Sequence, residues 1–459
     1  MINMLNIGKK AVAASQKQLE VTAHNIANVN TEGYSRQRLL QESSVVVSDA
    51  LGNWGTGVDL LRVERMRDLQ LDAEFRRFNT NSGYWGTMEK NMVELEKNIL
   101  ETTDYGVSTM INNFFDSWEF LSNNPFSNVH RMEVVDSAQN MINAFKDMYR
   151  AIEYKRDEIR QQLIVSADRI NQIAEDMAKT LQHISYDTAE NRPANDLWDK
   201  FDLLVDELSG YGNVSVYKRE NGTYSVYLGA DEIARNNIAS SLSLVEGENA
   251  FTGEYEMYLG WDITGTRLSC LNDGSINALM DLKDKILPGY MKQLDDLVVQ
   301  IAKEVNSIHS TGYNLANPDH TGADFFNPNV TGVKSFTLSK EVLTDPGFIA
   351  TSLTGQTGDN QIALMITDLR LAKIFNDQTI TESFSDIVYN IASDVKMTKM
   401  SSERAALLTR QTDNFRESVK GVSINEETAN LLKFQQSYQA AAKIISVADE
   451  MFKAIINMV

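Results

Sequence analysis

The chain has a single cysteine, Cys270, among its 459 residues. One cysteine excludes an intrachain disulfide, and it excludes every metal or redox site that is built on paired cysteines. We therefore expect Cys270 to be a small packed hydrophobic side chain. Stability must come from hydrophobic cores, and a chain of this length predicts two to four domains.

Basic residues are the minority among the charged ones. The 43 Lys and Arg stand against 63 Asp and Glu, which gives a formal net charge of −20. A field of this sign repels phosphate backbones and anionic lipid head groups. We therefore expect neither nucleic acid nor a membrane as a partner.

Long hydrophobic runs and a secretory signal are also lacking. No stretch approaches the roughly 18 apolar residues of a membrane-spanning helix. The N-terminal segment 1–10 places its lysines after its apolar residues, the reverse of a cleavable signal. The protein is expected either to stay in the cytoplasm or to leave by a route that cleaves no signal.

Catalytic motifs are missing as well. The five histidines have no metal-binding spacing, and the chain contains no nucleophile elbow, Walker or dinucleotide-binding pattern. The sequence therefore predicts no catalytic site, no metal and no cofactor. We expect surface or capping positions for all five histidines, which are His24, His130, His183, His309 and His320.

Helical periodicity is strongest at the two ends of the chain. Residues 1–28 contain no proline and carry one apolar residue in every heptad, with small residues three positions later. The apolar positions are Leu5, Val12, Leu19 and Ile26, and the small ones are Gly8, Ser15 and Thr22.

The last helix is predicted from about residue 424 to 457. Gly421 ends the preceding segment, and Ser423 and Glu426 have the spacing of a capping box. Two complementary heptad positions are then filled, one by Leu431, Tyr438, Ile445 and Phe452, the other by Phe434, Ala441, Ala448 and Ile455. Burying this double stripe against the first helix would leave further apolar residues on the flanking faces, namely Leu432, Ile444, Val447, Met451 and Ile456.

Between these ends the pattern changes several times. It predicts an extended connector at 31–61, helix at about 62–100, and a rod-like helix within the glycine-free stretch that follows Gly106. Alternating residues around Asn221-Gly222 predict a β hairpin. Helical patterns return at about 275–311, 359–374 and 380–419.

The expected fold is mainly α and multidomain, with a smaller inserted β domain. Nesting of the segments would let the terminal helices form an antiparallel, coiled-coil-like stem. We expect three parts: a terminal helical domain of 1–30 and 422–459, a helical rod of 31–205 and 273–421, and a β-rich outer domain of 206–272.

A longer motif closes the first helix. Its polar and glycine residues suit a helix terminus followed by a turn, with Tyr34 as an apolar cover. The motif residues are Asn25, Ile26, Asn28, Thr31, Gly33 and Tyr34. This arrangement resembles the N-terminal signature of the bacterial flagellar rod, hook and hook-associated protein family, and residues 426–457 resemble the terminal helix of the same family.

Three internal stretches favour the hook-associated junction members of that family. They are residues 106–125, 195–204 and 302–313. The resemblance implies a structural part of the flagellum that joins hook to filament. Its implied partners are the hook protein, a second junction protein, further copies in a ring of about eleven, and an export chaperone that holds the C-terminal helix.

The resemblance also implies export through the flagellar type III system and a final place outside the cell. It suggests an assembly interface made of the terminal heptad residues and the motif residues listed above. Two alternatives stay open: a hook or distal rod subunit of the same family, and a cell-wall hydrolase or protease carried on such a scaffold.

Overall fold

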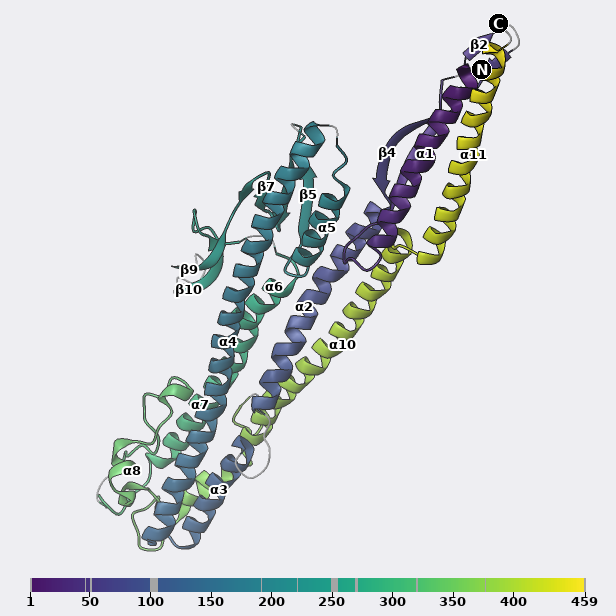
Figure 1. The fold of residues 1–459 in the computed structure, drawn as a ribbon. Coiled ribbons are helices and arrows are strands. Elements are labelled where there is room, and N and C mark those ends of the chain that lie inside the picture. The colour runs from purple at the N-terminus through teal and green to yellow at the C-terminus, as the bar shows by residue number, and fades with distance from the viewer. Residues whose placement is uncertain are drawn as a thin grey trace. The chain divides into compact units, whose positions relative to one another are not determined.

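The computed structural model describes residues 2–45, 47–49, 52–99, 106–190, 192–220, 222–248, 255–268, 271–318, 321–375 and 377–457. The expectations for Cys270, His320 and Asn221 lie outside the described residues. Within these ranges the chain is mainly helical, with a smaller antiparallel β region inserted between long helices, which confirms the predicted fold class (Figure 1).

The chain divides into two compact units, each assembled from segments that are distant in sequence. Unit 1 combines residues 1–84, 166–274 and 404–459, and unit 2 combines residues 85–165 and 275–403. Three long helices contribute to both units: α2 (Leu69–Ile99), α4 (Asn128–Ala189) and α10 (Ile380–Lys420).

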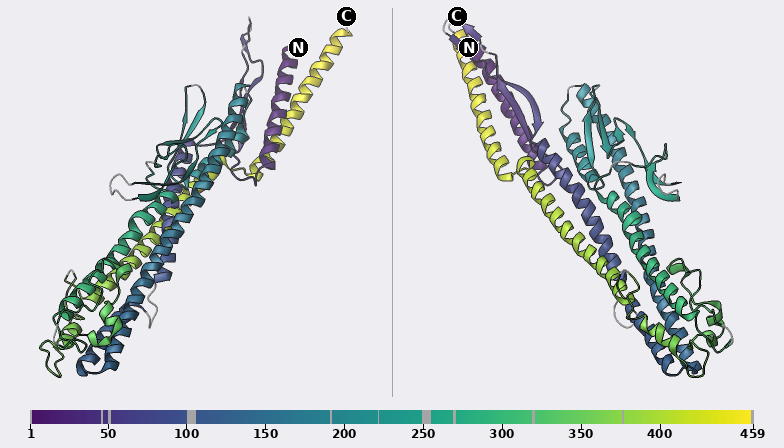
Figure 2. Two further views of the ribbon diagram at one scale, coloured as in Figure 1. Left: turned by 90° about the vertical axis from the view of Figure 1, so that its left-hand side faces the viewer. Right: turned by 180° about the vertical axis from the view of Figure 1, so that it is seen from behind.

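In unit 1 the terminal helices α1 (Ile2–Ala27) and α11 (Ile424–Ile456) lie antiparallel. They run side by side, with both chain ends at the same end of the pair (Figure 1 and Figure 2). A Cβ atom on Gly8 would lie only 2.8 Å from Cγ1 of Ile445. A larger side chain at position 8 would therefore require Ile445 or the helix pair to shift.

Small residues form the buried line of α1. Gly8, Ser15 and Thr22 are buried. The larger heptad residues beside them are half-buried, namely Leu5, Val12, Leu19 and Ile26. The contact thus follows the small positions, because they let the two backbones come close, and the larger residues flank it.

A β hairpin follows α1 and ends later than expected. β1 (Gln37–Ser43) pairs antiparallel with β4 (Val58–Arg65), and a shorter pair, β2 (Val47–Asp49) and β3 (Gly52–Trp54), lies between them in sequence. The helix predicted from about residue 62 begins only at Leu69, because residues 62–65 pair with β1.

The glycine-free stretch after Gly106 forms three helices, and the predicted rod-like helix is the middle one. They are α3 (Val107–Asn123), α4, and α5 (Asn195–Ser209). All the heptad residues predicted for the rod-like helix are buried on α4, namely Ala138, Ile142, Phe145, Tyr149, Ile152, Ile159, Leu163, Ile170, Ile173, Met177 and Ile184.

The β region of unit 1 follows α5. Strands β5 (Val214–Lys218), β6 (Tyr224–Leu228), β7 (Asp231–Arg235) and β8 (Ile238–Ala239) form an antiparallel meander in this order. Strands β9 (Leu242–Glu248) and β10 (Tyr255–Trp261) form a separate antiparallel pair. The predicted hairpin is therefore the β5–β6 pair.

In unit 2 a helical path crosses a proline. α6 (Ser275–Asp281) passes through one π turn (Leu282–Ile286) into α7 (Leu287–His309), and the N–H of Leu287 donates to the carbonyl of Leu282. Pro288 has no N–H to donate, and a π turn is one way to continue a helix past such a residue. The shorter helices α8 (Lys340–Thr344) and α9 (Gln361–Asp368) complete the unit.

His309 lies in the core of unit 2, where a surface or capping position was expected. Its exposed fraction is 0%, and its ring lies 5.5 Å from that of Phe325. The N–H of Ala350 donates to Nε2 at 2.8 Å, so Nδ1 carries the proton and donates to the carbonyl of Ala323 at 2.7 Å. Full pairing is what makes this burial tolerable, and it makes His309 a structural residue.

Candidate functional site

The motif residue Asn25 sits at the centre of the junction between the terminal helices and the rest of unit 1. It is buried, and its Nδ2 donates to the carbonyl of Gln37 at 2.9 Å and to Oε2 of Glu427 at 3.2 Å. Its Oδ1 accepts from the N–H of Gln37 at 2.9 Å and from the hydroxyl of Tyr34 at 2.8 Å. A side-chain amide has two donors and two acceptor sites, so every hydrogen-bonding group of the Asn25 side chain has a partner.

Arg36 connects the end of α10 to the start of α11. Its backbone N–H donates to the carbonyl of Lys420 at 2.8 Å, and its guanidinium pairs with Glu426 at 2.8 Å and with Glu427 at 2.7 Å. Glu427 is buried, so this pairing compensates for the loss of water around its charge. The N–H of Glu426 donates to Oγ of Ser423 at 3.5 Å, which confirms Ser423 as the N-cap of α11.

The turn after α1 is held by the other motif residues. Nδ2 of Asn28 donates to the carbonyl of His24 at 3.0 Å, and the hydroxyl of Thr31 donates to Oδ1 of Asn28 at 3.1 Å. Gly33 has a φ of +77°, and a Cβ atom there would lie 3.3 Å from Cβ of Leu203 on α5. Glycine suits this position both by its conformation and by the close approach of α5.

Tyr34 contributes a polar contact where only an apolar cover was expected. Its hydroxyl donates to Asn25 and lies 3.0 Å from Nδ1 of His24. Burial, and the nearby carboxylates of Asp196 and Asp199, raise the pKa of Tyr34 above its usual value. The phenol therefore stays protonated as a donor at every physiological pH.

Asp202 on α5 gathers three arginines from other elements. It pairs with Arg65 at 2.7 Å, Arg67 at 2.8 Å and Arg76 at 3.0 Å. Burial alone would raise the pKa of Asp202, but Arg67 and its neighbours outweigh burial and hold the pKa below the usual range. The carboxylate is therefore charged and fixes β4 and α2 to α5.

The same network reaches α10 through Arg416. Its guanidinium lies 4.0 Å above the ring of Phe75 and pairs with Asp72 at 3.0 Å and with Asp206 at 2.5 Å. At its other end the N–H of Ser35 donates to Asp199 at 3.0 Å. The loop after α1 is thus tied through α5 to α2 and α10.

Sequence reasoning did not select this network, although a signal was present. Asp199, Asp202 and Asp206 are three and four residues apart, a spacing that places them on one face of a helix. Arg65 and Arg67 are two residues apart and lie just before α2. An acidic face on one helix and closely spaced arginines before another would together have suggested that these two segments form ion pairs.

The predicted interface residues of α11 fall into three classes. Ala441 and Ala448 are buried, and Leu431, Phe434, Ile445 and Phe452 are half-buried. Tyr438 and Ile455 are exposed. The pattern predicted that α1 would cover both heptad positions of α11, and this coverage is incomplete. One partner helix is too narrow to cover both positions along all 33 residues of α11.

Further apolar side chains of α11 face solvent as well. Leu432 is 54% exposed and Ile456 is 70% exposed, and Ile424 and Met451 are also exposed. Ile444 and Val447, which were expected on flanking faces, are half-buried. Several large apolar side chains are therefore exposed along α11, on more than one side of the helix, in the described part of the chain.

Two kinds of site are missing from the described residues. They contain no group of three or more His, Cys, Asp or Glu side chains that could hold a metal ion. None of their helices is both long and apolar enough to cross a lipid bilayer. The features described above are a hydrogen-bonded junction between helices and the exposed apolar side chains of α11.

Comparison with known proteins connects these features to a family. The family model described as the flagellar hook-associated protein FlgK helical domain matches residues 92–326, just over half of the chain. The chain belongs to the FlgK family of flagellar hook-associated proteins. It is therefore an axial protein of the flagellum at the hook junction.

Both ends of this FlgK-family chain match models of the wider axial group. Residues 5–34 match the flagella basal body rod protein model, and residues 418–458 match the C-terminal model of the flagellar basal body rod FlgEFG protein. These ranges contain α1 with its motif, and α11. The helical-domain match favours the hook-associated assignment over the hook or distal rod alternative.

Relatives agree along the full length. The chain is 25% identical to flagellar hook-associated protein 1 of Bacillus subtilis, with 99% of this chain and 97% of the relative covered. It is 24% identical to the protein of that name from Escherichia coli, with both chains fully covered at 100%.

A solved structure has the same fold. The flagellar hook junction protein FlgK from Burkholderia pseudomallei superposes with a TM-score of 0.65 at 15% identity, covering 77% of this chain and 100% of that one. At this identity the likeness supports the fold of the FlgK-family chain.

Proposed function

We propose that this FlgK-family chain is a structural adaptor that caps the hook and forms the template on which a second junction protein, and then the filament, assemble. It acts through its surfaces, without catalytic turnover, in a ring of about eleven copies. The observation that carries the proposal is the set of large apolar side chains that are exposed along α11.

The energetic argument rests on those side chains. Because they lie on several sides of α11, more than one neighbour would be needed to cover them, and extensive exposed apolar surface marks sites of protein interaction. Each square ångström of apolar surface that a neighbour removes from water contributes about 25 cal/mol. Repetition of this contact around a ring would stabilise the assembly well beyond any single pair of subunits.

The two terminal helices divide this work. α1 uses its small residues for close packing within the chain, whereas α11 keeps Leu432, Tyr438, Met451 and Ile455 exposed. We assign most of the adhesion between subunits to α11. The division into a terminal domain (1–30, 422–459), a helical rod (31–205, 273–421) and an outer β domain (206–272) remains part of the proposal.

The same surface bears on export. Before assembly, exposed apolar side chains on α11 would promote aggregation, so a chaperone that covers them is expected. We propose that a flagellar export chaperone binds α11 in the cytoplasm and that the type III system delivers the chain to the outside of the cell. Hook protein and the second junction protein are its neighbours there.

Addition to isolated hooks tests the adaptor role. Full-length protein should bind to the distal end of purified hooks at a fixed stoichiometry, as seen by electron microscopy and by quantitative gels. Removal of residues 424–459 should abolish this addition while unit 2 stays folded. Undiminished addition of the truncated protein would contradict the assignment of adhesion to α11.

A point substitution separates adhesion from folding. Leu432→Asp places a charge on the exposed face and should lower hook addition at least tenfold with little effect on unfolding, because Leu432 is 54% exposed. Gln435→Asp is the matched control, since Gln435 is an exposed polar residue of the same helix. Equal loss by both variants would argue against an apolar contact.

A further inference from the structure

Helix α10 carries large apolar residues on the side that is exposed to solvent. They are Tyr389, Met397, Met400, Leu407 and Phe415. Their separations of three, seven and eight residues return each of them to one side of an α-helix. Ile387, Ile391 and Val395 occupy the opposite side and are buried. A surface helix normally has polar residues on its exposed side, so these apolar residues indicate a site for a partner.

Basic residues lie beside the apolar ones on this helix. The exposed basic residues are Lys396, Lys399, Arg404 and Arg410. Glu403 is the one acidic residue between positions 396 and 410, so this stretch has a net charge of +3. None of the four basic side chains forms an ion pair within the part of the chain that the structure describes. The residues that we call the α10 face all lie in unit 2, and they are Tyr389, Lys396, Met397, Lys399 and Met400.

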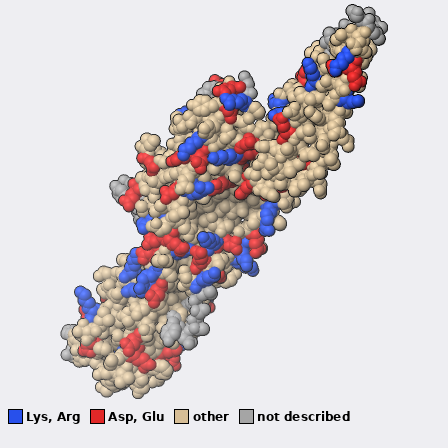
Figure 3. All heavy atoms as spheres, in the orientation of Figure 1, with Lys and Arg blue, Asp and Glu red and all other residues tan. Residues whose placement is uncertain are grey.

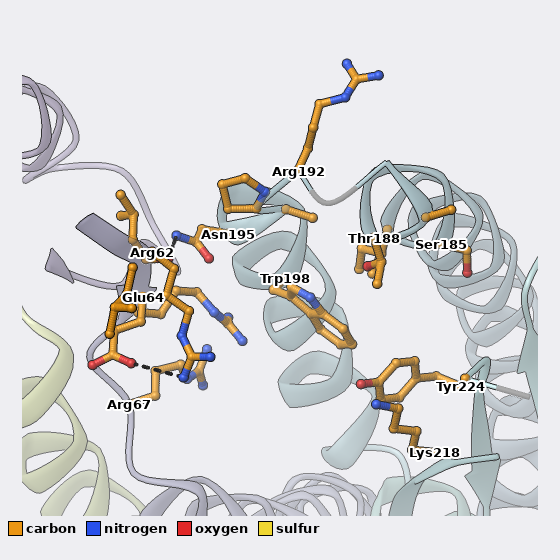
Figure 4. A pocket seen from close by; sticks show the side chains of 18 of the residues that line it. Arg62, Glu64, Arg67, Ser185, Thr188, Arg192, Asn195, Trp198, Lys218 and Tyr224 are labelled. Carbon is orange, nitrogen blue, oxygen red and sulfur yellow. Dashed lines mark hydrogen bonds and ion pairs between the residues drawn. The ribbon is translucent and has the colours of Figure 1, made fainter. Parts of the chain in front are cut away.

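The unpaired charge of α10 contrasts with the arginines of a groove of about 1320 Å³ in unit 1. Each arginine that lines this groove pairs with a carboxylate of the same chain: Arg62 with Glu64, Arg65 and Arg67 with Asp202, and Arg192 with Glu190. Figure 4 draws the first of these pairs. Basic and acidic side chains are also mixed on the face drawn in Figure 3. In a chain with a net charge of −20, the unpaired basic residues of α10 favour an acidic partner.

A surface with the complementary character occurs in unit 2, where α3 turns into α4. The hydroxyl oxygens of Ser117 on α3 and Ser137 on α4 lie 2.7 Å apart, so the two helices pack closely beside this turn. Large apolar residues are exposed around the turn, namely Phe120, Phe126, Val129 and Met132. Together with three exposed acidic residues, Glu119, Glu133 and Asp136, they form what we call the α3–α4 corner.

The acidic residues of the α3–α4 corner are available to a partner. Glu119 and Asp136 form no ion pair with any residue in the described ranges. The partner of Glu133 is His130 at 3.2 Å, which is charged only when it is protonated. Between residues 107 and 145 the chain has no lysine, and its one arginine is buried. The corner is therefore apolar and acidic, whereas the α10 face is apolar and basic.

We propose that the α10 face binds the α3–α4 corner of a second copy of this chain. Both surfaces are exposed in a single chain, which leaves them free to pair between copies. Opposite unpaired charges would set the orientation, and burial of the methionines and phenylalanines would stabilise the contact. Methionine side chains, present on both surfaces at Met132 and Met400, adapt readily to the shape of a partner.

The proposed contact joins two different surfaces, so it is heterologous. Identical subunits that are joined in this way form a ring or a helix. The inference rests on the proposed structural role, because it adds a second subunit contact to that of α11.

Cross-linking between engineered cysteines tests the contact without hook. In a Cys270→Ser background, one protein carries Met400→Cys on the α10 face and another carries Val129→Cys at the corner. Mixed at high concentration with a short thiol cross-linker, they should give a heterodimer in about tenfold higher yield than Met400→Cys mixed with Val165→Cys. Val165 is the matched control, because both valines are exposed residues of α4 and only Val129 lies at the corner. Equal yields for the two mixtures would overturn the proposal.

Charge reversal tests how the two surfaces recognise each other. Lys396→Glu with Lys399→Glu should lower the heterodimer yield about fivefold or more, and Glu133→Lys with Asp136→Lys in the partner should restore it. Lys292→Glu with Lys303→Glu is the control, because both lysines are exposed on α7 and the change in net charge is the same. An equal loss in the control would assign the effect to net charge and contradict the proposed contact.

Two further results follow from a heterologous contact. One chain that carries both Met400→Cys and Val129→Cys should give a ladder of oligomers, whereas the mixed single variants stop at dimers. On hook ends, a thiol-reactive benzophenone attached to Met400→Cys should capture residues 119–136 of a neighbouring copy after ultraviolet illumination. Capture of hook protein in place of a second copy would overturn the proposal.

Failure here and failure of the adaptor role can be told apart. The variants Lys396→Glu and Lys399→Glu leave α11 unchanged, so they should still bind hook ends as single copies through α11. Loss of cross-linking specificity with normal hook addition would remove the contact of the α10 face alone. Normal cross-linking by protein that never adds to hook would instead overturn the adaptor role.

Discussion

A Cβ atom placed on Gly8 of α1 would lie 2.8 Å from Cγ1 of Ile445 on α11. Real Cβ atoms essentially never lie that close to another atom, so a larger residue at position 8 would force the Ile445 side chain or the helix pair to shift. The line of small residues continues at Ser15 and Thr22, both buried. The stem of this FlgK-family protein is therefore set by backbone proximity, which makes it sensitive to added volume.

Gly8→Leu is expected to destabilise the terminal helix pair by about 1–3 kcal/mol, because overpacking forces side chains and backbone apart. Hydrogen exchange of α1 and α11 amides should become faster while amides of unit 2 keep their rates. Adding Ile445→Ala should restore much of the protection. Gly86→Ala, on α2 where an added Cβ meets nothing within 4 Å, should instead stabilise its helix by about 1 kcal/mol.

Asn25→Asp should loosen the junction between α1 and α11. The new carboxylate would replace an amide that donates to Glu427, and it would place two negative charges in a buried site. We expect faster proteolysis of the terminal helices and a loss of roughly 2–4 kcal/mol in unfolding free energy. Glu427→Gln in the same protein should recover most of the loss, and a failure of this rescue would assign the effect to the other three bonds of Asn25.

Long periodic segments were predictable because burial of one face of a helix places apolar residues at regular heptad spacing in the sequence. Every heptad residue proposed for the middle helix, from Ala138 to Ile184, is buried on α4. Prediction fails where this local pattern competes with a pairing between segments that are distant in sequence. Residues 62–65 have helical neighbours on one side, but they pair with β1, and this long-range pairing has no local signature.

The contacts of the motif show the same limit. Its residues could be listed from the sequence, and the turn at Asn28 and Thr31 follows from local chemistry. Its distant partners could not be listed. Glu427 lies 402 residues from Asn25, and Asp199 lies 164 residues from Ser35, so only the fold brings them together.

Asp202→Asn should cost stability at neutral pH and little in acid. The folded-state pKa of Asp202 lies below its unfolded value of about 3.9. The charged carboxylate therefore stabilises unit 1 above about pH 4, and this contribution is lost as the pH falls through the folded-state pKa. Urea unfolding, monitored by hydrogen exchange of α5, should show a difference between the two proteins at pH 7 that shrinks as the pH falls through the folded-state pKa. A difference that is independent of pH would mean that packing, and not charge, holds the network.

The stability of unit 2 should depend on pH in a higher range, because of His309. Burial lowers the pKa of His309 from 6.5 to about 4, because the ring, which lies between Ala350 and Ala323, is removed from the solvent that would stabilise a positive charge. Between these two pH values His309 binds a proton in the unfolded chain but not in the folded chain. The unfolding free energy must therefore fall as the pH decreases from 6.5 to 4.

The total change attributable to His309 is on the order of 3 kcal/mol at about 1.4 kcal/mol per pKa unit. Urea unfolding at a series of pH values, followed by the fluorescence of Trp118, whose ring lies 6.2 Å from His309, would measure it. His309→Phe should lower stability at pH 7 but flatten the slope between pH 6.5 and 4. His183→Gln, at an exposed site on α4, should leave the slope unchanged. An unaltered slope in His309→Phe would show that other groups, and not this buried imidazole, cause the acid sensitivity of unit 2.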